Sequence, residues 1–162
     1  MDYTVIKASD FIKHPKAYVF PKHLSDVSWI STNGKNKKCY INAFCGFDIE
    51  TYTTPEHYGY MYIWQFSLDD DVVIGHTWED FVKLLSYLKV CNQLDHDHHM
   101  IVFIANMSFE FQFLRKWVTV EAVLAKEERK PMFVLVNECF EFRDALQITG
   151  GSLAFLAENY TT

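Results

Sequence analysis

The sequence predicts an α/β domain built around a mixed β-sheet, and three observations lead to this class. Aromatic and β-branched runs in the first half are separated by short polar turns, as in strands joined by hairpins. Two segments further along carry apolar residues at helical spacing. Between these two segments lies one continuous apolar run, MIVFIAN, which indicates a strand covered on both faces.

The first half predicts an antiparallel meander followed by a helix. Strands are expected over 38–51, 58–68 and 72–77, with a loop at TTPEHYG and a tight turn at the three aspartates 69–71. The helix is expected over 77–90. Thr77 can cap it, and four apolar residues share one face: Phe81, Leu84, Leu85 and Leu88.

The second half predicts a central strand over 100–106 and a helix over 107–118. KEERKP reads as a charged turn, and MFVLVN and FEFRDAL as a strand pair around Glu138. A last helix is expected within 149–160, starting near Ser152. The order β-β-β-α-β-α-β-β-α is that of a ribonuclease-H-like mixed sheet with helices on both faces.

Charge divides the chain into two parts. Net charge is −6, which argues against non-specific duplex binding by the whole surface. Residues 1–40 nevertheless carry seven Lys against three Asp, leaving 8 of the 15 basic residues and 18 of the 21 acids for the remainder. We predict an irregular basic extension over 1–38, with at most one short strand, and a folded domain over 39–162.

The sequence also bears on location. MDYTVIKASDF lacks the basic start and apolar run of a signal peptide, and no stretch approaches the ~18 unbroken apolar residues of a membrane span. The four cysteines show no CxxC spacing and lie in or beside apolar runs, as expected in a reducing compartment. We expect a cytoplasmic protein with no membrane partner.

Two carboxylates lie two positions apart in CGFDIETY, at Asp48 and Glu50. Alternate residues of a strand share a face, so both side chains point the same way. Their repulsion is costly unless water bathes them or a cation lies between them, and Mg²⁺ favours such oxygen ligands. A solvated strand end is the alternative interpretation.

A second motif, NMSFEFQF, follows the central strand. Glu110 falls near the first turn of the next helix, where the helix dipole alone favours an acid. Phe109 and Phe113 are four apart and share a face, which suits either core packing or stacking against nucleic-acid bases. The sequence DHDHH, 95–99, is spaced too tightly for a closed zinc site and is interpreted as a solvated loop.

FDIET, followed some 55 residues later by N-x-x-F-E, resembles the first two exonuclease motifs of the proofreading 3′–5′ exonuclease domain of family B DNA polymerases. The compact spacing is closest to the protein-primed phage group. DALQI, 144–148, resembles that group's single-strand-binding motif. The resemblance covers roughly residues 40–162.

The resemblance implies a site and its partners. Asp48, Glu50 and Glu110 would be catalytic and hold two Mg²⁺ or Mn²⁺ ions that act on the 3′ end of single-stranded DNA. The residues that match the DNA-holding positions are Thr51, Asn106, Phe109, Phe113 and Leu146. A terminal protein and a polymerase domain are further expected partners, in host bacterial cytoplasm if the protein is phage-encoded. A second copy of the chain is expected on a separate ground, because a clipped final helix would expose apolar surface.

The chain departs from the family at four positions. Glu110 stands where the family has Asp, Ala145 where it has Ser or Thr, and Ala105 where a polar residue is common. The last motif, Tyr-x-x-x-Asp, is absent, so the exonuclease domain is expected to be incomplete at its C-terminus. Two alternatives follow: a catalytically dead module that binds single-stranded DNA or a protein, and a small enzyme on an unrelated α/β fold.

Overall fold

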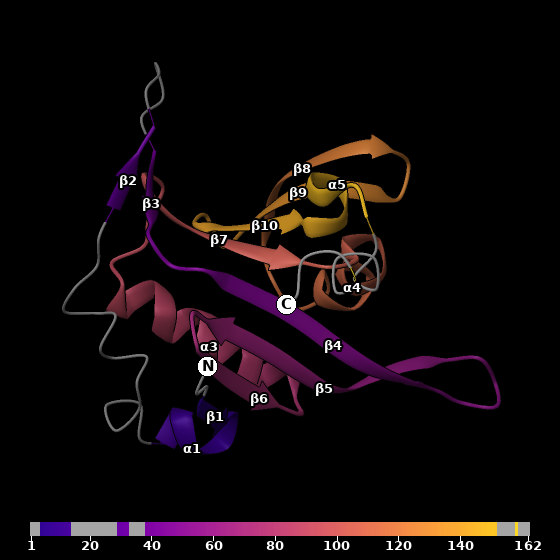
Figure 1. Ribbon diagram of the computed structural model, residues 1–162. Helices are drawn as coiled ribbons and strands as arrows, with labels where there is room; N and C mark the ends of the chain where they lie inside the picture. Colours follow the sequence, from indigo (N-terminus) through magenta and orange to yellow (C-terminus); the bar gives the residue numbers. More distant parts are fainter. Residues whose placement is uncertain (1–3, 14–28, 33–37, 152–157, 159–162) are drawn as a thin grey trace.

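The computed structural model describes residues 4–13, 29–32, 38–151 and 158 (Figure 1). In chain order the elements are β1 Thr4–Lys7, α1 Ala8–Lys13, β2 Trp29–Ser31, β3 Cys39–Ile41, β4 Cys45–Thr53, β5 Gly59–Leu68, β6 Asp71–Gly75, α3 Trp78–Cys91, β7 His98–Ile104, α4 Met107–Leu114, β8 Val120–Glu127, β9 Lys130–Val136, β10 Phe140–Asp144 and α5 Ala145–Thr149.

One mixed sheet organises the described chain. Its strands run in the order β1-β6-β5-β4-β7-β10-β9-β8, and β2 and β3 form a hairpin whose β3 strand also pairs with β7. The strands β4, β5 and β6 form the expected antiparallel meander. β7 lies parallel to both β4 and β10, while β9 is antiparallel to β10 and to β8. The α/β class with a mixed sheet is therefore confirmed.

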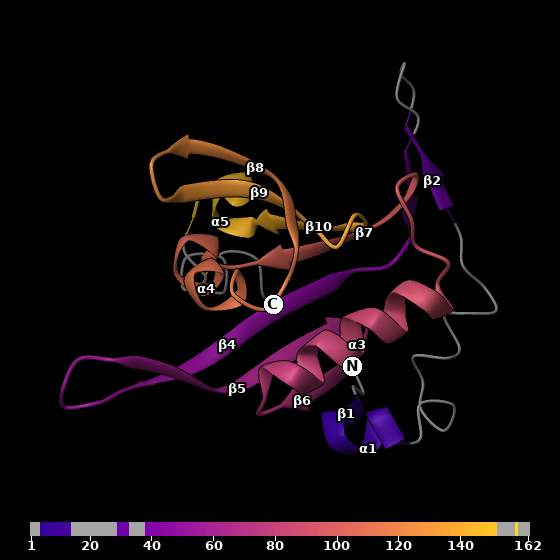
Figure 2. The same cartoon turned by 180° about the vertical axis from the view of Figure 1, so that it is seen from behind.

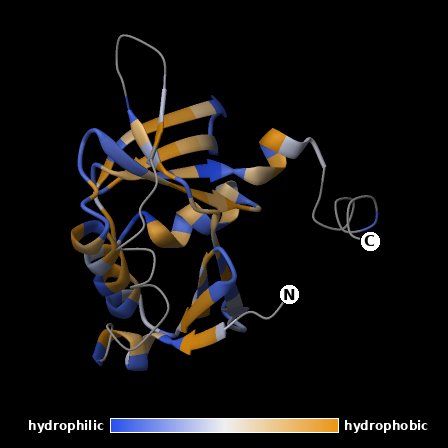
Figure 3. Ribbon diagram, turned by 60° about the vertical axis from the view of Figure 1, so that its left-hand side comes forward, coloured by the Kyte–Doolittle hydropathy of each residue, from blue (hydrophilic) through white to orange (hydrophobic). Residues whose placement is uncertain are grey.

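The core lies between the sheet and α3. The helix buries the four residues that the sequence placed on one face, Phe81, Leu84, Leu85 and Leu88. Phe47 of β4 meets Phe81 at a ring-centroid distance of 4.6 Å. Thr77 caps the helix as expected, because its hydroxyl accepts from the Asp80 backbone N–H at 3.2 Å. Hydrophobic residues run along the central strands in Figure 3.

Figures 1 and 2 show α3 on one side of the sheet and the five-residue α5 on the other. The helix expected over 149–160 falls largely outside the described residues. None of the helices in the described ranges is both long and apolar enough to cross a membrane.

The long strand expected over 38–51 is in fact two strands, β3 and β4, separated by residues 42–44. Phe44 leaves the strand geometry because it binds the turn between β5 and β6. Its backbone N–H donates to Asp69 Oδ1 at 2.8 Å, and the Asp69 N–H donates to the Phe44 carbonyl at 2.7 Å. The two hydrogen bonds between Phe44 and Asp69 therefore interrupt a segment whose local sequence favours one continuous strand.

Other boundaries also differ from expectation. Residues 4–13 are not irregular: β1 pairs with β6, and Phe11 of α1 packs edge-on against Tyr87 of α3 at 5.1 Å. The helix expected over 107–118 ends at Leu114, and Trp117 then stacks on Trp78. The strand β8 was not expected, because this edge strand is exposed throughout and shows no buried-exposed alternation.

Two glycines test the packing of the sheet. A Cβ at Gly75 would overlap the Trp64 ring, which is fully buried and donates through Nε1 to the Thr77 carbonyl at 2.8 Å. A Cβ at Gly46 would approach only the Ser67 hydroxyl, at 2.9 Å, and that hydroxyl can rotate. We predict that Gly75→Ala lowers the free energy of unfolding by about 1–3 kcal/mol and that Gly46→Ala has a smaller effect.

Urea denaturation of the two variants and the wild type provides the measurement. Equal destabilisation by both substitutions would contradict this account of the packing around Trp64.

Candidate active site

The carboxyl ends of β7 and β10 lie beside the middle of β4, where the parallel pairing of β4 with β7 stops. β4 carries Asp48 directly after this point, β7 is followed by Asn106 and α4, and β10 ends at Asp144. Parallel pairing requires these ends to lie together, and this is where open α/β sheets bind ligands. Glu110, in the first turn of α4, is thereby brought to Asp48 and Asp144.

Glu110 is a buried acid among acids. Its side chain is only 3% exposed, and its Oε2 atom has no hydrogen-bond partner among the described residues. Burial raises the pKa of Glu110 to about 9, with further contributions from the Asp48 charge, a hydrogen bond to Asp48 and the Asp144 charge. At neutral pH the metal-free protein therefore holds Glu110 protonated and donating to Asp48.

This pair fits a divalent cation. An orphaned carboxylate oxygen beside a second carboxylate is an unsatisfied oxygen-ligand set, and Mg²⁺ usually takes only one or two carboxylates. Across the described ranges, no three His, Cys, Asp or Glu side chains gather into a complete metal-binding group. Water and a substrate phosphate would have to supply the remaining ligands.

Glu50, the third expected ligand, is placed differently. It lies two residues after Asp48 on β4 and shares that strand face, but its side chain is exposed. It is not among the acids whose charges raise the pKa of Glu110. The structure thus brings together Asp48 and Glu110, and leaves Glu50 at the exposed rim.

The residues expected to hold DNA differ in how exposed their side chains are. Asn106 is exposed and forms the N-cap of α4, yet its side chain makes no capping hydrogen bond, so its amide can face a ligand. Phe109 is 44% exposed, and its ring centre lies 5.3 Å from that of Phe113. Thr51 is half-buried on β4, at a register shift.

The two remaining residues are more enclosed. Phe113 packs against the core and lies close to Gly59 at the start of β5. Leu146 is half-buried in α5, and its backbone N–H donates to Asp144 Oδ1 at 2.9 Å. Phe109 therefore offers its ring to solvent, while Phe113 supports it from behind.

Asp144 is a member of the site that the sequence analysis missed. It is 4% exposed, caps α5 and contributes to the raised pKa of Glu110. The available signal was its position, since it is an acid at the junction of a strand and a helix. Using that signal required knowing that this strand runs parallel to β7.

A hollow of about 290 Å³ opens on the sheet face beside Asp48. Phe44 and Phe103 stack on each other at its side, with ring centres 5.4 Å apart, and Gln65 contributes polar atoms. Ala105 and Ala145, two of the departures from the family pattern, also line it. Their small side chains leave this space open.

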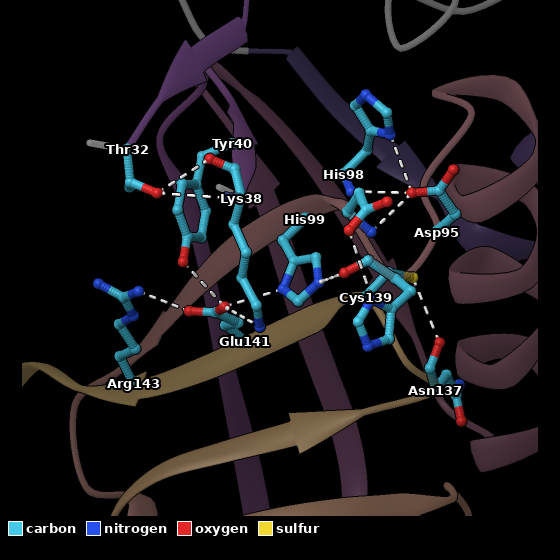
Figure 4. A network of polar contacts seen from close by, with 12 residues as sticks. Thr32, Lys38, Tyr40, Asp95, His98, His99, Asn137, Cys139, Glu141 and Arg143 are labelled. Atoms are coloured by element: carbon cyan, nitrogen blue, oxygen red, sulfur yellow. Dashed lines mark hydrogen bonds and ion pairs between the residues drawn. The ribbon is translucent and has the colours of Figure 1, made fainter. Parts of the chain in front are cut away.

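A second polar cluster surrounds Glu141 (Figure 4). Its buried carboxylate accepts from His99 Nδ1 at 2.8 Å, from the Tyr40 hydroxyl at 3.1 Å and from Arg143. Lys38 Nζ lies 3.6 Å away. His99 Nε2 also donates, to the His96 carbonyl at 2.7 Å.

The Glu141 cluster is structural. It joins β3, β7 and β10 at His99, five residues or about 17 Å before the end of β7, so it lies at the opposite end of the parallel strands from Glu110. The segment 95–99 is not a solvated loop throughout, because His98 and His99 begin β7 and His99 is buried. Asp95 Oδ1 accepts from the backbone of Asp97 and His98.

Comparison of the chain with protein-family models, curated proteins and solved structures finds no match. Function must therefore be argued from the site itself.

The buried carboxyl of Glu110 predicts a pH-dependent stability difference. Because its pKa is raised in the fold, its stabilising contribution is complete below the unfolded value of 4.5 and is lost as pH rises toward 9. In EDTA, Glu110→Gln should be more stable than the wild type at about pH 8, by at least about 1 kcal/mol or ~2–4 °C in melting temperature. The difference should nearly vanish at about pH 5. A pH-independent difference in thermal denaturation would contradict a neutral, buried Glu110.

The Glu141 cluster predicts a pH dependence of stability opposite to that of Glu110, because the pKa of Glu141 is lowered. Burial alone would raise the pKa of Glu141, but hydrogen bonds from His99, Arg143 and Tyr40 and the Arg143 charge lower it to about 2. Its contribution is present above the unfolded value of 4.5 and is lost as pH falls toward 2. Glu141→Gln should cost about 3–5 kcal/mol at about pH 6 and less at about pH 3. Urea denaturation at the two pH values measures this, and an equal cost at both would rule out an ionised Glu141.

Proposed function

We propose that the chain is a 3′–5′ exonuclease-like domain of the family B polymerase type, with a ribonuclease-H-like fold, acting on the 3′ ends of single-stranded DNA. The observation that carries the proposal is the buried Glu110 carboxyl beside the half-buried carboxyl of Asp48. The strand order β6-β5-β4-β7-β10, with β7 parallel to its neighbours, supports the fold assignment.

Asp48 and Glu110 would hold the divalent ion, with Glu50 at the exposed rim. When bound, Mg²⁺ or Mn²⁺ would activate a water and stabilise the leaving 3′ oxygen. The carboxylates of this chain would give up the proton that they share when they bind the cation.

The neighbouring residues would orient the substrate. Phe109 offers an exposed ring to a base, and Asn106 offers an amide that its own helix does not use. The hollow beside Asp48 has room for one sugar or base between Phe103 and Gln65. The hollow is lined by Asp48, and Asn106 and Phe109 belong to the same α4 segment as Glu110, which would suit the positioning of a terminal nucleotide.

A non-cutting module that binds single-stranded DNA is the second candidate. It is favoured by the raised pKa of Glu110, which disfavours its charged form, and by the lack of a third ligand that would complete a metal-binding group among the described residues. A terminal protein and a polymerase domain remain proposed partners on the strength of the sequence resemblance.

The test of cutting uses a 5′-labelled single strand with Mn²⁺. We predict shortening from the 3′ end by the wild type, and a loss of about 10²-fold or more in rate for Asp48→Asn and for Glu110→Gln. Asp80→Asn, at a half-buried acid paired with Lys83 on α3, is the matched control and should cut normally.

Metal binding is measured separately. Mn²⁺ should raise the melting temperature of the wild type and of Asp80→Asn, but not of Asp48→Asn. If the wild type binds the single strand without cutting it and Mn²⁺ leaves its melting temperature unchanged, the exonuclease proposal is wrong and the binding module stands.

A further inference from the structure

The hairpin formed by β4 and β5 reaches out beyond the helices (Figures 1 and 2). Its tip turns at Thr54 and Tyr58: the Thr54 N–H donates to the Tyr58 carbonyl at 2.9 Å, and the Tyr58 N–H donates to Thr54 Oγ1 at 3.2 Å. Four of the residues from 51 to 62 are tyrosines, and each is more than half exposed: Tyr52, Tyr58, Tyr60 and Tyr62.

Two of these tyrosines share the strand face of the acids, and a third lies at the hairpin tip next to them. Tyr52 lies two residues after Glu50, so alternation along β4 puts it on the face of Asp48 and Glu50. Tyr60 is the cross-strand partner of Tyr52, and Tyr58 lies two residues before Tyr60. We call Tyr52, Tyr58 and Tyr60 the tyrosine ribbon.

A β-bulge creates this arrangement. Glu50 pairs with Ile63, but Thr51 pairs with Met61, so Tyr62 is an extra residue on β5. Without the extra residue, Tyr52 would face Met61, and Tyr60 would lie on the other side of the sheet. The bulge turns Met61 toward the core and Tyr60 toward the acids.

The chemistry of the tyrosine ribbon suits flat, uncharged groups. Residues 51–62 contain Glu56 but no Lys or Arg, so the hairpin cannot attract phosphates by charge. It offers instead rings that tolerate water at their hydroxyl edge. Unpaired bases stack on such rings whatever their sequence, whereas bases in a duplex are already stacked on each other.

The position of the tyrosine ribbon relative to Asp48 favours a single strand as its ligand. Tyr52 is four residues, or about 13 Å, from Asp48 along β4. A single strand with its terminal phosphodiester at Asp48 and Glu110 can continue along this same face, and its next bases then meet the tyrosines.

We propose that the tyrosine ribbon is a stacking platform for unpaired bases upstream of the 3′ end that the acid pair holds. This inference rests on the proposed function and extends it, since it makes the substrate a single strand several nucleotides long, bound without regard to base sequence.

The experiment measures binding of fluorescein-labelled single strands to the full chain in EDTA by anisotropy. Tyr52→Ala/Tyr60→Ala should raise the Kd for a strand of about ten nucleotides by about tenfold or more, and change little for one of about three. Tyr52→Phe/Tyr60→Phe keeps the rings and should bind within about twofold of the wild type. Tyr52→Leu/Tyr60→Leu keeps apolar area without a ring and should resemble the alanine variant.

One control variant and one replacement variant complete the experiment. Leu124→Ala removes an apolar side chain that is 61% exposed on β8, far from the ribbon in sequence, and should bind normally. The single variant Tyr58→Ala, at the hairpin tip, replaces the double variant if the latter fails to show wild-type circular dichroism, and should raise the Kd about threefold or more.

The binding and cutting measurements distinguish the stacking platform from the exonuclease activity. Unchanged binding by the alanine variants, or full binding by the leucine variant, overturns the stacking platform even if the wild type cuts DNA. Weakened binding by the alanine variants supports it even if the wild type does not cut. Absence of any binding to single strands by the wild type overturns both.

Discussion

Parallel pairing of β7 with β4 on one side and with β10 on the other determines where the chemistry of this protein can be. The pairing brings the carboxyl ends of β7 and β10 to the point on β4 where its pairing with β7 stops. Asp48 directly follows that point, Asp144 ends β10, and Glu110 lies on the helix that follows β7. Asp48, Glu110 and Asp144 are far apart in sequence, and no local preference would gather them. Two of the three are less than 5% exposed, so the fold accepts a concentration of buried carboxyls there.

Such a concentration is unfavourable unless it is relieved. The fold relieves it in part by keeping a proton on Glu110 and in part by letting Asp144 accept backbone hydrogen bonds at the start of α5. The Glu141 cluster at the other end of the same strands is the contrast, because Lys38 lies beside one of its carboxylate oxygens and Arg143 beside the other. A buried acid with basic partners is satisfied within the fold, whereas the buried Glu110 beside Asp48 keeps one oxygen without a hydrogen-bond partner among the described residues.

The sequence was sufficient for elements with a strong local signal. The meander, the helix α3 with its Thr77 cap and the central strand β7 all follow from alternation, helical spacing or a continuous apolar run. It was insufficient where tertiary contacts decide. β8 has no buried face, Phe44 leaves its strand to bind Asp69, and the pairing partner of His99 is an acid 42 residues away.

The site shows the same division. Asp48 and Glu110 could be selected from motif and spacing, but Asp144 depended on the direction of β10, and the facing of Tyr60 on a bulge that no short motif encodes. Glu50 was included in the site although its side chain is exposed. Strand alternation correctly puts it on the face of Asp48, but it does not give its distance from Glu110. The sequence pattern predicts on which side of the sheet a side chain lies, but not how close it lies to the other residues of the site.

The most direct test of the acid pair is the anomalous diffraction of crystals soaked in Mn²⁺. The account predicts an anomalous peak between the carboxyl groups of Asp48 and Glu110, with Mn–O distances of about 2.0–2.3 Å, and no comparable peak in crystals of Glu110→Gln. A Glu110 carboxyl that still donates to Asp48 in the soaked wild type, with no peak beside it, would contradict the account.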